Sequence, residues 1–201
     1  MKPIQVLLCS TLALGLSVAA PALASAADLY CAADAGTDIT LVNGPAACRA
    51  RTDARGQARA AGYDGVGYAE ATEGASALGI GIAGGRGASD AAGGIPVALG
   101  IGPDAVATTS LTEPVAAPPG EAVSPSGPRP IEIPVTPSPF AITIAFGGSY
   151  AMVSATERAV TCLGAGALAW DAGTGRACLA TPFGIWQRTS PTDEARVASQ
   201  H

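Results

Sequence analysis

Few residues of this chain are of the types that carry out nucleophilic catalysis. The single histidine, His201, is the last residue, and the single lysine, Lys2, is the second. Chain ends are usually poorly ordered, so His201 is a poor general base for a Ser-His-Asp or Cys-His arrangement. Lys2 is the only lysine that could form a Ser-Lys dyad or a Schiff base. We therefore predict that the protein is not an enzyme and has no catalytic residues.

Carboxylates are the remaining groups that could do chemistry. Glu70 with Glu73, or Asp64 with Asp90, could form an acid–base pair, although carboxylates in an acidic chain are usually just solvated. Asp64, Asp90 and Asp104 each lie near glycines, where Ca²⁺ ligands occur in β-rolls. Such rolls repeat an aspartate at strict spacing in every turn, and this chain does not. We predict no metal and no cofactor.

The cysteines predict disulfides rather than a metal site. Cys9 falls within the predicted leader described next, which leaves an even number: Cys31, Cys48, Cys162 and Cys178. No Cys-x-x-Cys spacing occurs, so a zinc site is disfavoured. Four cysteines allow three pairings. We predict the two near pairs, Cys31–Cys48 and Cys162–Cys178; a pairing that joins the two ends would mean that both ends pack together.

Residues 1–26 have the pattern of a secretory signal peptide. Lys2 supplies the positive start, residues 4–18 are mostly apolar, and Ala24-Ser25-Ala26 is a small-x-small cleavage site. An uncleaved anchor is the alternative, but the apolar core is short for a membrane span. We predict cleavage near Ala26, a secreted or cell-envelope-associated protein, and no membrane span after cleavage.

The stretch from Ala50 to Ser110 carries a small residue at every second position over long runs. This is the period of a β-strand, and a face of Gly and Ala suits the crowded interior of a narrow stacked coil. The register slips at 62–65, 71–74 and 102–105, where we predict corners. Residues 77–81 recur as residues 98–102, which indicates an internal repeat. We predict a parallel β-solenoid; a flexible Gly/Ala linker is the alternative, but it would lack the interleaved Ile, Val and Leu.

The other face of the alternation carries the larger side chains, and from it we select a candidate binding face. Nucleic acid is not an expected partner, because the chain has sixteen acidic residues against eleven basic ones. A bare solvated face is the simplest interpretation of the arginines, and contact with another polyanion is the alternative. An unknown protein or envelope partner and self-association both remain open. The candidate residues are Arg49, Arg51, Arg55, Arg59, Leu78, Ile80 and Ile82.

The rest of the chain divides by composition. We predict a solenoid-like domain over 27–110 with an N-terminal disulfide cap, and a proline-rich linker over 111–139 that holds nine prolines. A small β module follows over 140–187, predicted as a five-strand antiparallel meander, and 188–201 is a polar tail. Alternatively, this module packs on the open end of the solenoid as its second cap. The fold class is all-β: a Gly/Ala-rich parallel stack, then a disulfide-linked antiparallel meander.

Two resemblances follow from these motifs. The run Val97-Ala98-Leu99-Gly100-Ile101-Gly102-Pro103-Asp104-Ala105-Val106-Ala107 resembles the head repeats of trimeric autotransporter adhesins, although no coiled-coil stalk or anchor barrel accompanies it. The whole chain more closely resembles an uncharacterised family of small exported actinobacterial proteins. That resemblance is carried by residues 64–67, 98–105 and 178–184, and it implies no activity.

We therefore expect a non-catalytic exported protein that acts as a structural or adhesion module. The alternative is a small secreted enzyme or enzyme inhibitor that acts through the C-terminal β module. A cleft lined by carboxylates would favour the alternative.

Overall fold

The structure is a computed structural model, and it describes residues 27–111, 139–154 and 156–190. The predicted signal peptide, almost all of the predicted linker and the last part of the predicted tail therefore lie outside the described residues. Within the described ranges the chain is all-β, with fifteen strands and no helix.

Nine strands precede the proline-rich segment and six follow it. The first group comprises β1 (Asp28–Asp34), β2 (Asp38–Asn43), β3 (Ala46–Thr52), β4 (Gln57–Tyr63), β5 (Val66–Ala71), β6 (Ser76–Ile82), β7 (Arg86–Ala91), β8 (Ile95–Ile101) and β9 (Val106–Leu111). The second group comprises β10 (Phe140–Phe146), β11 (Tyr150–Ser154), β12 (Ala159–Leu163), β13 (Ala167–Asp171), β14 (Arg176–Thr181) and β15 (Gly184–Arg188).

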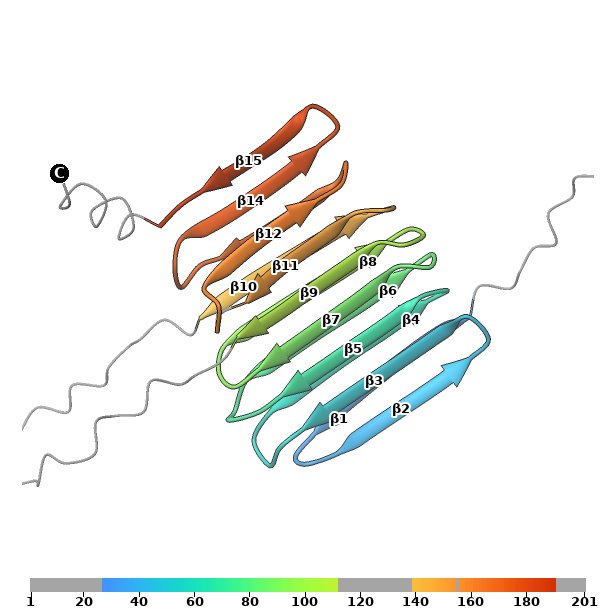
Figure 1. The fold of residues 1–201 in the computed structure, drawn as a ribbon. Helices are drawn as coiled ribbons and strands as arrows, with labels where there is room; N and C mark the ends of the chain where they lie inside the picture. Colours follow the sequence, from blue (N-terminus) through green and yellow to red (C-terminus); the bar gives the residue numbers. More distant parts are fainter. Residues whose placement is uncertain (1–26, 112–138, 155, 191–201) are drawn as a thin grey trace, which may run out of the picture.

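The strands form two sheets, and from β3 to β11 successive strands alternate between them. The eight-stranded sheet has the order β1-β4-β6-β8-β10-β13-β14-β15, and the seven-stranded sheet has the order β12-β11-β9-β7-β5-β3-β2. All neighbours from β4 to β10, and from β3 to β11, are parallel. Figure 1 shows the stack running from β1 and β2 at one end to β14 and β15 at the other. This confirms the predicted parallel β-solenoid-like stack followed by antiparallel strands.

The predicted slips in register are corners between strands. Each contains a non-glycine residue with a positive φ: Asp64 at 52°, Glu73 at 57° and Asp104 at 58°. These left-handed residues redirect the chain from one sheet to the other. The inward positions change from even to odd across 62–65 and 102–105, and they stay odd across 71–74, so the small residues remain inside.

One aspartate ties the corner between β3 and β4 to the corner between β5 and β6. The Asp53 carboxylate, between β3 and β4, accepts hydrogen bonds from the backbone N–H groups of Arg55 at 3.0 Å, Gly56 at 2.8 Å and Glu73 at 2.5 Å. The hydrogen bond from Arg55 is the largest of the effects that lower the pKa of Asp53, and the other two act in the same direction. All three lower the pKa because they favour the charged carboxylate.

The space between the sheets is too narrow for large side chains. A Cβ atom on Gly79 of β6 would overlap the carbonyl oxygen of Tyr68 on β5, in the facing sheet. Gly67 and Gly87 meet the facing backbone in the same way, at Ala61 and Ile80. Most side chains of the two core clusters are accordingly alanines and cysteines. The narrow interior thus explains why small residues alternate along the strands.

The interior also holds a few hydroxyl groups, and strand carbonyls satisfy them. Thr109 on β9 and Thr143 on β10 share a hydrogen bond of 2.7 Å, and Thr109 also donates to the carbonyl of Val97. Ser89 donates to the carbonyl of Pro96 at 2.8 Å. A hydroxyl is small enough for the gap and removes the cost of burial by bonding across it.

The connection after the proline-rich segment differs from the predicted five-strand meander. β10 pairs in parallel with β8, and β11 pairs in parallel with β9, so these two strands lie in opposite sheets. The turn between them, residues 147–149, is another solenoid corner, in which Gly148 N–H donates to the carbonyl of Pro103. After the linker, the consecutive antiparallel neighbours are β11 and β12 in one sheet, and β13, β14 and β15 in the other. The strands after the linker therefore cap the open end of the stack, which was the alternative arrangement.

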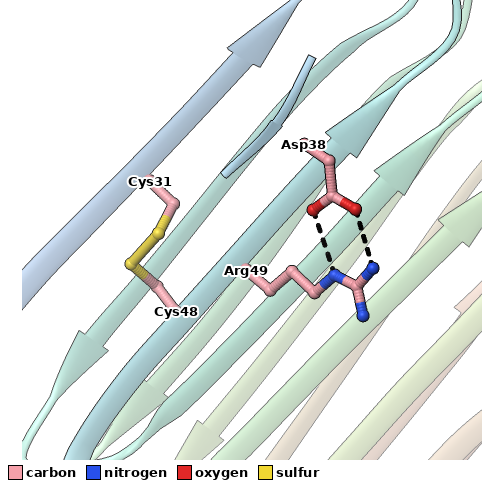
Figure 2. Close-up of a disulfide and its surroundings, with 4 residues drawn as sticks. All are labelled: Cys31, Asp38, Cys48 and Arg49. Carbon is pink, nitrogen blue, oxygen red and sulfur yellow. Dashed lines mark hydrogen bonds and ion pairs between the residues drawn. A yellow bond between two sulfur atoms is a disulfide. The ribbon is translucent and has the colours of Figure 1, made fainter. Parts of the chain in front are cut away.

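Both predicted disulfides are confirmed, and each joins the two sheets. Cys31 on β1 bonds to Cys48 on β3 at the N-terminal end of the stack (Figure 2). Cys162 on β12 bonds to Cys178 on β14 at the other end. All four cysteines are buried. The two sheets are thus linked covalently at the first and last layers, where a neighbouring coil is lacking on one side.

Candidate functional site

The structure does not bring the seven candidate residues onto one face. Arg49 and Arg51 lie on β3, in the seven-stranded sheet, and Arg55 lies in the corner that follows. Arg59 on β4 lies in the eight-stranded sheet, beside Leu78 of β6. Ile80 and Ile82 continue outward along β6. The set is divided because strands that follow one another in the sequence belong to opposite sheets.

Three of the four arginines are paired with acidic side chains of neighbouring strands. Arg49 donates from Nε and Nη2 to Asp38 of β2, at 3.1 and 2.7 Å (Figure 2). This bidentate hydrogen bond lowers the pKa of Asp38 and raises the pKa of Arg49. The other two pairs are Arg59–Asp34 at 3.0 Å and Arg51–Glu70 at 3.6 Å. These arginines balance local carboxylates, so they do not form an unneutralised basic patch.

The outer face of the eight-stranded sheet is instead a broad apolar surface. Along β6, β8, β10 and β13 the inward positions are mostly Ala and Gly, and the outward positions carry branched aliphatic and aromatic side chains. We call the following residues the apolar face: Leu78, Ile80, Ile82, Val97, Leu99, Ile101, Phe140, Ile142, Ile144, Phe146, Leu168, Trp170, Leu179 and Trp186.

Strand register arranges the apolar face in continuous rows. One row crosses six strands and another crosses four, and directly opposed side chains in a sheet are close enough to pack together. The longer row is Ile80, Leu99, Ile144, Leu168, Leu179 and Trp186, and the shorter one is Leu78, Val97, Ile142 and Trp170. A third row is Ile82, Ile101 and Phe146.

These side chains point to solvent because the interior has no room for them. Those in the middle of the rows are partly buried by their neighbours, while Phe146, Trp170 and Trp186 are about half exposed. Contiguous apolar patches beyond a few hundred Å² on soluble proteins mark contact surfaces. The apolar face is thus the strongest candidate for an interaction surface in the described part of the chain.

A hollow deepens the apolar face over β13–β15. Its volume is about 340 Å³, and its lining includes Leu168, Trp170, Leu179 and Trp186. The indole of Trp170 also meets the ring of Phe140 edge-on, at 5.9 Å between centroids, which fixes one wall. Of the apolar residues of this face, the predicted binding face contained only Leu78, Ile80 and Ile82 of β6. The same alternation of large apolar residues in 97–101 and 140–146 was the signal that could have extended it.

The outer face of the seven-stranded sheet is polar in comparison. The Tyr68 hydroxyl donates a hydrogen bond to Glu70. Partial burial is the main cause that raises the pKa of Tyr68 to about 12, and this hydrogen bond is the second cause. The pKa of Asp90 is raised mainly by burial and secondly by the negative charge of Glu70. A shallow hollow of about 240 Å³ lies over this region. The carboxylate whose charge acts on Asp90 is therefore Glu70, and not Asp64, which was considered as its partner.

Neither a metal cluster nor a membrane-spanning helix is found in the part of the chain that the structure describes. No group of three or more His, Cys, Asp or Glu side chains gathers there into a site that could hold an ion. None of the described residues belongs to a helix long and apolar enough to cross a bilayer.

These features define an all-β, solenoid-like protein with a disulfide at each end and an apolar outer sheet. The chain belongs to a family of unknown function (DUF6764), whose model matches residues 2–127. This confirms the predicted resemblance to an uncharacterised family. The match includes β1 to β9, whereas β10 to β15 lie beyond it. No curated protein and no solved structure matches the chain.

Proposed function

We propose that the protein is a non-catalytic, exported binding module that acts through the apolar face, either secreted or held in the cell envelope. The apolar face is the observation that carries this proposal. Its longest row crosses six strands without a charged side chain. Keeping such a surface in water is unfavourable, so a partner that covers it would be stabilised by burial of the rows.

Two further observations support export and presentation of a surface. Disulfides persist in oxidising compartments, so the two cystines are consistent with an extracellular protein. The resemblance of residues 97–107 to adhesin head repeats implies a β-roll that displays its outer faces, and an actinobacterial exported family would fit this role.

A second candidate function uses the C-terminal strands alone. The hollow between Trp170 and Trp186 could seat an apolar side chain of a target protein. This favours the inhibitor form of the alternative over the enzyme form, because the lining offers no acid or base pair. Arg188 is its one charged lining residue.

We expect the exported protein to lack its first 26 residues or nearly so. N-terminal sequencing of protein recovered from the medium or the envelope should begin at Ala27 or within two residues of it. An intact chain that begins at Met1 and stays inside the cell would contradict the proposed location and would remove the oxidising environment that the disulfides need.

If a partner covers the apolar face, its side chains should be shielded from solvent in intact cells. Oxidative footprinting of intact cells, compared with dilute purified protein, should show several-fold lower modification of Trp186 and Phe146. Leu163 is the matched control, because it is as exposed as Trp186, at 53%, but lies on β12 in the seven-stranded sheet. Equal modification of Trp186 in both preparations would overturn the proposed function.

A further inference from the structure

We propose that the occupant of the apolar face is the apolar face of a second copy of this chain, in a two-fold dimer. This inference rests on the proposed function and specifies its partner. In the arrangement that we infer, the two-fold axis runs parallel to the strands, so that β15 of each copy lies over β1 of the other. The argument depends on the area of the face, its lack of charge and the distribution of charges at its two ends.

The outer face of the whole eight-stranded sheet has the area of a stable protein–protein interface. Its eight strands, which are β1, β4 and the six strands of the apolar face, cover roughly 750 Å² at a spacing of about 4.8 Å and about 3.3 Å per residue. A standard interface buries about 800 Å² per partner. Two sheets stack face to face about 10 Å apart when their side chains interdigitate, as the regular rows of this face allow.

The chemistry of the face selects an apolar protein partner. The outward side chains of β6, β8, β10 and β13 carry no charge, and charge first appears at the edges, with Arg59 on β4 and Arg188 on β15. An anionic membrane or a polyanion would need a cluster of cations there, and the whole chain has a formal net charge of −5. A charged surface would lose its hydration without compensation on this face.

The ends of the face are complementary to each other. The β1 end carries Asp28 and Asp34, while the β15 end carries Arg188. A two-fold axis parallel to the strands reverses the stacking order and preserves position along each strand. It therefore sets Trp186 over Tyr30 of the second copy. Arg188 comes within reach of that copy's Asp34, which also pairs with Arg59 of its own chain. A two-fold interface must be complementary to itself, and the reversed strand order meets that condition by placing the Arg188 end over the acidic β1 end.

Sedimentation of the exported, disulfide-bonded protein over two orders of magnitude in concentration tests the dimer. We expect a reversible monomer–dimer equilibrium, with Trp186 and Phe146 protected from oxidation as the dimer forms. Leu99→Glu places a charge in the centre of the face and should weaken association by more than about a hundredfold. The matched control, Val106→Glu, lies on β9 beside Arg86, in the other sheet, and should leave association unchanged. Circular dichroism should show that both variants fold.

Charge exchange tests the arrangement. Arg188→Glu should weaken the dimer by about fivefold, and adding Asp34→Arg should recover most of that loss. A dimer insensitive to Leu99→Glu, or an open series of larger assemblies, would overturn the proposal. Arg188→Glu without effect, or no recovery in the double variant, would overturn the arrangement in which the two-fold axis runs parallel to the strands. A strict monomer would overturn self-association, whereas protection of Trp186 in cells would then still support the proposed function with a different partner.

Discussion

Gly79→Val is expected to abolish the cooperative thermal transition, or to lower the free energy of unfolding by about 3 kcal/mol or more. Gly79 lies at the centre of β6, with its Cα facing β5 and β7 of the opposite sheet. Its added Cβ would overlap the Tyr68 carbonyl oxygen and lie 2.7 Å from the Tyr68 carbonyl carbon and 2.9 Å from the Gly87 oxygen. These are backbone atoms of paired strands, so they cannot move aside without breaking ladder hydrogen bonds.

Gly147→Val is the matched control for this test. A Cβ on Gly147 would meet no atom closer than 3.8 Å, and the residue does not have a left-handed φ. Thermal melting followed by circular dichroism should therefore separate the two variants clearly. If Gly79→Val melted at the same temperature as Gly147→Val, the interior would be wider than the structure shows. The narrow interior would then no longer explain why the large side chains point outward.

Removing either disulfide is expected to be the next most damaging change. The two cystines close loops with sequence separations of 17 and 16, for which the chain-entropy estimate is about 3 kcal/mol each. We expect the loss of Cys162–Cys178 to be the greater, because it joins β12 to β14 where the sheets are completed by short antiparallel strands. The variants are Cys162→Ala with Cys178→Ala, and Cys31→Ala with Cys48→Ala, which keep the buried positions apolar.

Urea unfolding of the two double variants measures these effects, and peptide mapping without reductant establishes the pairing first. If its native state is intact, each double variant should unfold at a lower midpoint concentration of urea. The dependence of its unfolding free energy on urea concentration should be unchanged. Free thiols in the exported protein would contradict the predicted pairing. A Cys31–Cys178 link would do so as well, because β1, which carries Cys31, and β14, which carries Cys178, lie at opposite ends of the stack (Figure 1).

The apolar face also gives a physical reason for the composition of the chain. Hydrophobic residues make up 48% of it, yet among the residues that the structure describes the largest fully buried side chain is a valine, Val153. A narrow solenoid buries backbone and methyl groups, so much of its aliphatic content remains on the outer surface. Because few large side chains are buried, the two disulfides contribute a larger share of the stability of such a fold.

Local sequence was sufficient for several features of this protein. The alternation of Gly and Ala determined the strands and the narrow interior, because only small side chains fit between close backbones. Breaks such as 62–65 determined the corners, since a slip of one residue exchanges the two faces of a strand. The spacing of the four cysteines determined their pairing, because each short loop lies at one end of the stack.

Only the tertiary structure decided which strands share a sheet. Arg51 and Leu78 belong to the same alternating pattern, yet they point outward on opposite sheets, because the corners between their strands carry the chain across the interior. The join of β10 to β8 spans the whole proline-rich segment, a separation that no local pattern reports. The apolar face exists because this long-range parallel pairing sets Ile144 beside Leu99 and so merges two separate runs of alternation into one surface.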